Sequence, residues 1–144
     1  ALAANWEIYA RKATEHSQPI NRNAWSLVGP MHIADTREEA MKNVRFGLKE
    51  WITHFKDVAG LTMAPEGEDP AEALVASGLA VIGTPDDAIA QIERLEEESG
   101  GFGTFLQMAH NWADWTETKR SYELFSRYVV PEFQKRTDSP HGIY

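Results

Sequence analysis

Three consecutive side chains, His110, Asn111 and Trp112, have the types and the placing that chemistry would need. They follow residues 102–109, a short apolar segment that the pattern predicts to be a buried strand. In parallel α/β folds the active site lies at the carboxyl ends of the strands. An imidazole there could hydrogen-bond a reacting oxygen, and an indole could line an apolar pocket. The alternative is a loop whose polar groups satisfy the neighbouring backbone.

A second histidine, His32, lies inside residues 25–34, another apolar segment predicted to be a strand. Alternation along a strand places His32 on one face with Val28, Pro30 and Ala34. Two interpretations remain open: a side chain that lines a substrate pocket, or a core histidine satisfied by one partner. The second is favoured, since buried polar groups nearly always have a hydrogen-bond partner.

Other motifs have structural explanations. The segment Thr84-Pro85-Asp86-Asp87 predicts a helix start with Thr84 as N-cap. Anion binding at that helix end is disfavoured, because two carboxylates already occupy its positive end. Glu50 and His54 lie four residues apart, yet the chain has no cysteine and no second histidine at ligand spacing, so no metal site is expected.

Composition narrows the classes of function. The 144 residues are 42% hydrophobic and 25% charged, with a formal net charge of −8. An acidic chain is a poor partner for nucleic acid or an anionic membrane, both of which attract clustered Lys and Arg. No apolar run approaches the roughly 20 residues that span a bilayer. The absence of cysteine fits a cytoplasmic protein.

The chemistry-bearing residues must be held by alternating helices and strands. Helices are expected at 5–17, 36–59, 85–98 and 116–135, strands at 25–34 and 102–109, and a long loop at 60–82 with a short helix at 70–77. This order predicts a helix-rich α/β fold with parallel strands. Pro30 argues against the first strand, because proline removes a ladder donor. Two parallel strands cannot bury both faces of a sheet. Either further strands complete the sheet, or the chain rearranges as a helical assembly.

Three segments together carry a family resemblance: residues 27–40, residues 81–90, and residues 100–113 continuing through 120–125. They resemble the bacterial-luciferase-like flavin-dependent monooxygenases, in the branch near limonene and alkanal oxidation. The resemblance implies a TIM-type (β/α)8 barrel, with 25–34 and 102–109 as about its seventh and eighth strands. Residues 1–144 would then be a single incomplete domain, the carboxyl-terminal part of the barrel, and residues 60–82 a mobile insertion.

The same resemblance implies a function for the parent protein. It would use reduced flavin mononucleotide (FMN) and O2 to oxidise an apolar small molecule, with a flavin reductase as partner and a homo-oligomeric state. His110 would be the catalytic residue, and His32, Asn111 and Trp112 would line the substrate pocket. Most cofactor-binding residues would lie upstream, so the segment alone is expected to be inactive. Two alternatives stay open: a non-catalytic, self-associating helical module, and a deazaflavin-dependent oxidoreductase of the same barrel family.

Overall fold

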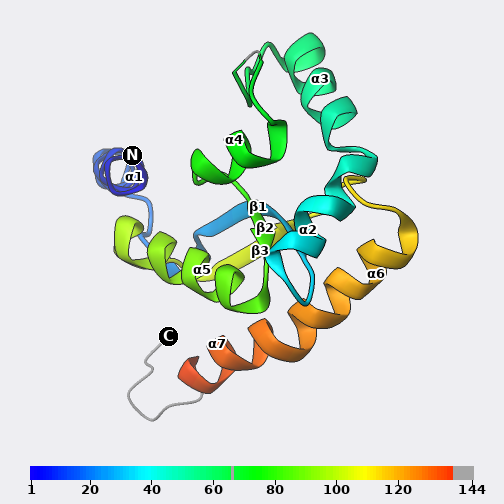
Figure 1. Ribbon diagram of the computed structural model, residues 1–144. Coiled ribbons are helices and arrows are strands. Elements are labelled where there is room, and N and C mark those ends of the chain that lie inside the picture. Colours follow the sequence, from blue (N-terminus) through cyan, green and yellow to red (C-terminus); the bar gives the residue numbers. More distant parts are fainter. Residues whose placement is uncertain (66, 138–144) are drawn as a thin grey trace.

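A computed structural model describes residues 1–65 and 67–137 of the chain (Figure 1). Helices alternate with short strands, as the sequence pattern predicts. In chain order the elements are α1 (Leu2–Glu15), η1 (Arg22–Ala24), β1 (Ser26–Ile33), α2 (Arg37–Asn43), η2 (Val44–Phe46), α3 (Leu48–Ala59), α4 (Pro70–Ala76), β2 (Val81–Gly83), α5 (Pro85–Ser99), β3 (Thr104–Met108), α6 (Trp115–Leu124), the π-helical turn η3 (Phe125–Val129) and α7 (Val130–Thr137).

The strands form one parallel sheet in the order β2-β1-β3. Residues 26–30 of β1 pair with β3, and residues 31–33 pair with β2 on the other side. The parallel pairing of the two expected strands is confirmed. The third strand, β2, was missed because it has three residues and begins within the segment expected to be a loop. So short an apolar run has no periodicity of its own.

Pro30 lies in the middle of β1 without disturbing the sheet. The Trp25 carbonyl points toward β3 and accepts the Gly103 N–H at 2.9 Å, whereas the Ala34 N–H points toward β2 and donates to the Gly83 carbonyl at 2.9 Å. Backbone groups alternate in direction along a strand, so residue 30 faces the β2 side. Strand β2 has not yet begun at that level. The missing N–H of the proline therefore costs no ladder hydrogen bond.

The two faces of the sheet are covered differently (Figure 1). The face that carries Met31 and Ile33 packs against α5, α6 and η3 in a continuous apolar cluster. On the opposite face, the carboxyl half lies under α2 and α4, but the amino half is open. There Val28 and its register partner Leu106 are 59% and 51% exposed. A parallel sheet is normally covered on both sides, so this pair marks an unfilled layer.

The prediction of one continuous helix over residues 36–59 is wrong. The segment breaks into α2, η2 and α3 at Gly47. A Cβ at Gly47 would lie 2.2 Å from the Asn111 carbonyl oxygen, and the Gly47 N–H donates to the Trp112 carbonyl at 2.9 Å. The loop after β3 therefore takes the space that a continued helix would fill. The expected ends are confirmed, with Thr36 as N-cap and Gly60 in the left-handed conformation.

Residues 60–82 are more ordered than a long loop. The short helix expected there is present as α4, capped by Asp69, and the first two residues of β2 follow. Residue 66 lies outside the described part of the chain. Whether this segment is a mobile insertion stays a prediction.

The last two helical regions agree with the sequence pattern. Thr84 caps α5 and forms a reciprocal capping box with Asp87. The helix expected at 116–135 runs as α6, η3 and α7, with the π-helical turn in its middle. Within residues 1–65 and 67–137, no helix combines the length and apolarity needed to cross a bilayer.

Candidate functional site

His110 follows the end of β3, and both of its ring nitrogens contact backbone groups. Its Nε2 lies 2.9 Å from the Met31 carbonyl oxygen of β1. Because a carbonyl only accepts, Nε2 carries the proton, and Nδ1 is free to accept the Trp112 N–H at 3.4 Å. The imidazole stacks on the Trp112 indole with ring centres 3.9 Å apart. In this geometry His110 links the backbone of β1 to the backbone of the loop that follows β3.

This link exists because β1 extends beyond the last residue of β3. The Met31 carbonyl and the Ile33 N–H point toward the β3 side, where no strand remains to pair with them. The carbonyl accepts from His110 and from Gln107 Nε2 at 3.2 Å, and the Ile33 N–H donates to Ser121 Oγ at 2.9 Å. Side chains thus continue the ladder, as buried backbone groups require. Gln107 and Ser121 were not among the residues predicted from the sequence; Gln107 is a polar residue inside an apolar stretch, whereas Ser121 lies in a polar stretch and gives no signal.

His32 is 0% exposed and has one hydrogen-bond partner in the described part of the chain. Its Nε2 lies 3.3 Å from Nδ2 of Asn43 in α2, and the same Asn43 nitrogen donates to Glu117 Oε2 of α6 at 3.2 Å. Its other nitrogen, Nδ1, is buried and has no hydrogen-bond partner among the described residues. This geometry agrees with the expectation of a core histidine with one partner. The expectation did not include a second ring nitrogen that is buried without a partner.

Both histidines are held in the neutral form. Burial lowers the pKa of His32 from 6.5 to about 4; nearby His110 lowers this pKa further, and Asp114 opposes the shift. Burial also lowers the pKa of His110, against the raising effect of its hydrogen bond to Met31. Neutral imidazoles can donate and accept single hydrogen bonds but cannot attract an anion by charge.

Trp112 is also fully buried, and its Nε1 has no hydrogen-bond partner in the described part of the chain. Its indole meets Trp51 edge-on at 5.2 Å and packs in the apolar cluster under α2 and α4. Asn111 is exposed. The structure thus brings His32, His110 and Trp112 together at one end of the sheet, with Asn111 on the adjoining surface.

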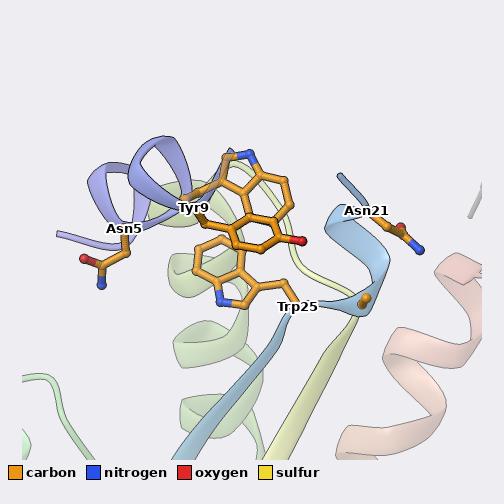
Figure 2. A pocket seen from close by; sticks show the side chains of 6 residues that line it. Asn5, Tyr9, Asn21 and Trp25 are labelled. Atoms are coloured by element: carbon orange, nitrogen blue, oxygen red, sulfur yellow. The ribbon is translucent and has the colours of Figure 1, made fainter. Parts of the chain in front are cut away.

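A second cluster of aromatic and polar side chains lies at the amino ends of the strands (Figure 2). It forms a cleft of about 250 Å³ lined by Asn5, Trp6, Tyr9, Asn21, Ala24 and Trp25. Trp6 stacks on Trp25 with ring centres 5.2 Å apart, and the Arg22 guanidinium lies 4.4 Å from the Trp6 ring centre. Arg22 Nη1 also donates to the Ser99 and Gly101 carbonyls at 2.7 and 3.0 Å. These contacts attach α1 to the end of α5.

Within residues 1–65 and 67–137, no group of three or more His, Asp or Glu side chains is arranged so that it could hold a metal ion. Glu50 and His54, whose spacing raised the question of a metal site, both lie on α3.

In parallel α/β folds the functional site lies at the carboxyl ends of the strands, and His32, His110 and Trp112 lie there. Comparisons with known proteins then specify the relatives. No family model matches the chain. The chain is 41% identical over 133 residues to limonene 1,2-monooxygenase of Rhodococcus erythropolis, covering 92% of this chain and 34% of that protein. It is 32% identical over 149 aligned residues to 4-hydroxyprotoasukamycin monooxygenase of Streptomyces nodosus subsp. asukaensis, covering 99% of this chain and 39% of that protein.

Two solved monooxygenase structures also match the chain. The oxygenating constituent of 3,6-diketocamphane monooxygenase of Pseudomonas putida, a type II Baeyer–Villiger monooxygenase in complex with FMN, matches with a TM-score of 0.67 and 26% identity, covering 91% of this chain and 39% of that chain. A monooxygenase of Streptomyces bottropensis shares the fold, with a TM-score of 0.60 and 19% identity over 92% of this chain and 38% of that chain.

The resemblance stated from the sequence is confirmed: the chain is homologous to part of the flavin-dependent, luciferase-like monooxygenases. It spans between 34% and 39% of the length of these relatives. FMN is the cofactor bound in the related structure.

Proposed function

We propose that this chain forms the carboxyl-terminal part of a (β/α)8 barrel in a monooxygenase that uses reduced FMN and O2. The observation that carries the proposal is the unequal covering of the sheet. In such barrels the helices surround the sheet and the inner face lines the lumen. Helices α5 and α6 cover the face of Met31 and Ile33, so the face with Val28, Leu106 and His32 would be the inner one.

On this proposal β1 and β3 are about the seventh and eighth strands. Residues 60–82 are then an insertion between the helices that follow β1 and the start of α5. The carboxyl ends of β1 and β3 would form part of the active-site rim, where His32, His110, Asn111 and Trp112 are the candidate residues.

The residues of this chain fit a rim better than a complete cofactor site. His32 Nδ1 and Trp112 Nε1 are buried polar atoms that could hydrogen-bond a flavin or substrate oxygen. We propose that the flavin is held mainly by parts of the barrel that this segment does not include. When bound, the flavin supplies the electrons that reduce O2, and one oxygen atom passes to the substrate.

The candidate residues then divide into two roles. His110 is the predicted catalytic residue, but the backbone contacts of both its nitrogens favour a role in fixing the rim. Trp112 and the cluster around it would exclude water from the reaction and receive an apolar substrate.

The test uses the longer protein that carries this segment. Given a flavin reductase, FMN and isotopically labelled oxygen gas, it should insert one labelled atom into limonene or a bicyclic ketone, detected by mass spectrometry. A reaction without reductant is the control. Turnover with a reduced deazaflavin and none with reduced FMN would establish the alternative oxidoreductase. No product with either cofactor would refute the catalytic proposal.

A non-catalytic, self-associating module is the second candidate, favoured by one observation. Val28 and Leu106 form an exposed apolar pair on an uncovered sheet face, which a second copy could bury. Sedimentation of the 144-residue chain tests this reading. A monodisperse monomer that melts cooperatively would contradict it, and a concentration-dependent dimer abolished by Val28→Lys would support it.

A further inference from the structure

We infer that His32 Nδ1–H is a hydrogen-bond donor for an uncharged oxygen of the bound ligand, and that Asn43 and Glu117 hold the ring in this state. The inference rests on the proposed function only for the origin of the ligand. The donor itself follows from the geometry of three side chains on three different elements, β1, α2 and α6.

Glu117 determines the direction of every hydrogen bond in the group. An ionised carboxylate only accepts, so the Asn43 atom 3.2 Å from Glu117 Oε2 must be the amide nitrogen. The same nitrogen lies 3.3 Å from His32 Nε2, which must therefore accept. A neutral imidazole that accepts at Nε2 carries its proton on Nδ1. Asn43 and Glu117 are thus positioning residues, and His32 presents an N–H.

Two buried donors at the strand ends, His32 Nδ1–H and Trp112 Nε1–H, differ from the polar groups around them, because neither has a hydrogen-bond partner among the described residues. His110 has a contact at each nitrogen, and Gln107 and Ser121 each bond a backbone group of β1. His32 Nδ1 is buried and has no hydrogen-bond partner among residues 1–65 and 67–137. A buried donor without a partner destabilises the fold, so a ligand that supplies an acceptor gains from pairing with it.

The surroundings define the chemical class of that acceptor. Beside the polar Asn43 and His110, the side chains near His32 include apolar ones, its register partner Ile82 and the neighbouring Ala34. Two carboxylates contribute negative charge here: Glu117, which is hydrogen-bonded to the Asn43 that contacts His32, and Asp114. They would repel a carboxylate or a phosphate. An uncharged carbonyl oxygen on an apolar molecule fits both the donor and the cluster.

The first experiment reads the tautomer of the unliganded 144-residue chain. Nitrogen-15 NMR of histidine-labelled protein at neutral pH should show His32 with its proton on Nδ1 and His110 with its proton on Nε2. Glu117→Gln removes the obligate acceptor and should shift His32 toward the Nε2–H form. Glu123→Gln is the matched control on the same helix, since the Glu123 carboxylate pairs with the exposed Lys119 at 4.0 Å.

The second experiment supplies the acceptor. Norcamphor, a bicyclic ketone, should shift the His32 Nδ1 resonance on titration, whereas norbornane, the hydrocarbon of the same shape, should not. In His32→Leu the affinity for norcamphor should fall about tenfold, the effect of one buried hydrogen bond, with norbornane binding unchanged. Near-ultraviolet circular dichroism checks that the variant is folded.

The outcomes are decisive in both directions. His32 in the Nε2–H form, no response to norcamphor, or equal responses to both compounds would overturn the inference, even if His32→Leu fails to fold. None of these measurements needs flavin. A longer protein that fails to oxygenate substrates would refute the proposed function while leaving the His32 donor intact, so the two failures are distinguishable.

Discussion

The two ends of the sheet carry similar side-chain types in opposite environments. At the amino end, Arg22 stacks on the half-buried Trp6, and the cleft beside them is open to solvent (Figure 2). At the carboxyl end, His110 stacks on Trp112, and both the Trp112 indole and His32 are fully buried. A guanidinium stays charged at either end, whereas burial of an imidazole changes its pKa. The contacts at the amino end therefore attach α1 to the rest of the fold, whereas burial at the carboxyl end lowers the pKa of His32 and His110.

The largest expected effect comes from removing one indole at each end. Trp112→Ala deletes a fully buried side chain and should lower the free energy of unfolding by about 4 kcal/mol, through lost burial and the cavity left behind. Trp6→Ala should cost about 1 kcal/mol, because its ring is only half-buried and mainly supports a cation–π contact. Urea unfolding measures both. Trp115, 75% exposed, offers a control whose truncation should be nearly neutral. Equal losses for Trp6 and Trp112 would break the comparison.

Acid should destabilise the protein by protonating the histidines at the carboxyl end of the sheet. The pKa of His32 is 6.5 when unfolded and about 4 when folded, so the unfolded chain takes up the proton first. The stability due to neutral His32 is therefore complete above pH 6.5 and falls as the pH drops toward 4, by on the order of 3 kcal/mol. His110, whose pKa is also lowered, acts in the same direction.

The control for this pH dependence is His32→Gln, which should flatten the decline between pH 6.5 and 4 in urea unfolding at a series of pH values. Asp87 belongs to a separate window, because Arg37 lowers its pKa from 3.8 to about 2, so its loss begins below pH 3.8. An unchanged slope in His32→Gln would show that burial of His32 does not govern the response.

The backbone network of the carboxyl end should show coupling. His110→Phe keeps the stack on Trp112 but removes one donor to the Met31 carbonyl, at an expected cost of about 1.5 kcal/mol. Gln107→Leu removes the other donor. The double variant should lose more than the sum of the single variants, because only then is the carbonyl without a partner. Strict additivity in a thermal or urea cycle would mean that the two donors do not share this acceptor.

The smallest effect is expected at the amino end. Arg22→Met removes the hydrogen bonds to Ser99 and Gly101 and the contact with Trp6, so α1 should loosen locally. Hydrogen exchange of the α1 amides should accelerate about tenfold, while global stability changes by less than about 1 kcal/mol. Arg22→Lys should not restore protection, because an ammonium lacks the planar fork. A matching increase in exchange at β1 would show that the two ends are not independent.

The sequence pattern predicts functional residues at the carboxyl end of the sheet, but it does not rank the two histidines there. It places His110 as the catalytic candidate because the residue follows a strand, and that role stays a prediction. The structure shows both His110 nitrogens bound to backbone groups and leaves His32 with the free one. The partners that decide this lie far away in the chain: Met31 is 79 residues from His110, and Glu117 is 74 residues from Asn43.

What the sequence by itself determined is local. The Thr36 and Thr84 caps, the glycine ends of α3 and α5 and the apolar strands follow from interactions within a few residues, which the order of side chains encodes directly. Tertiary structure decided the pairing of β2 and the break at Gly47, because both depend on backbone brought from elsewhere in the chain. It also decided the protonation of His32, since burial and the Asn43–Glu117 contact exist only when β1, α2 and α6 pack together.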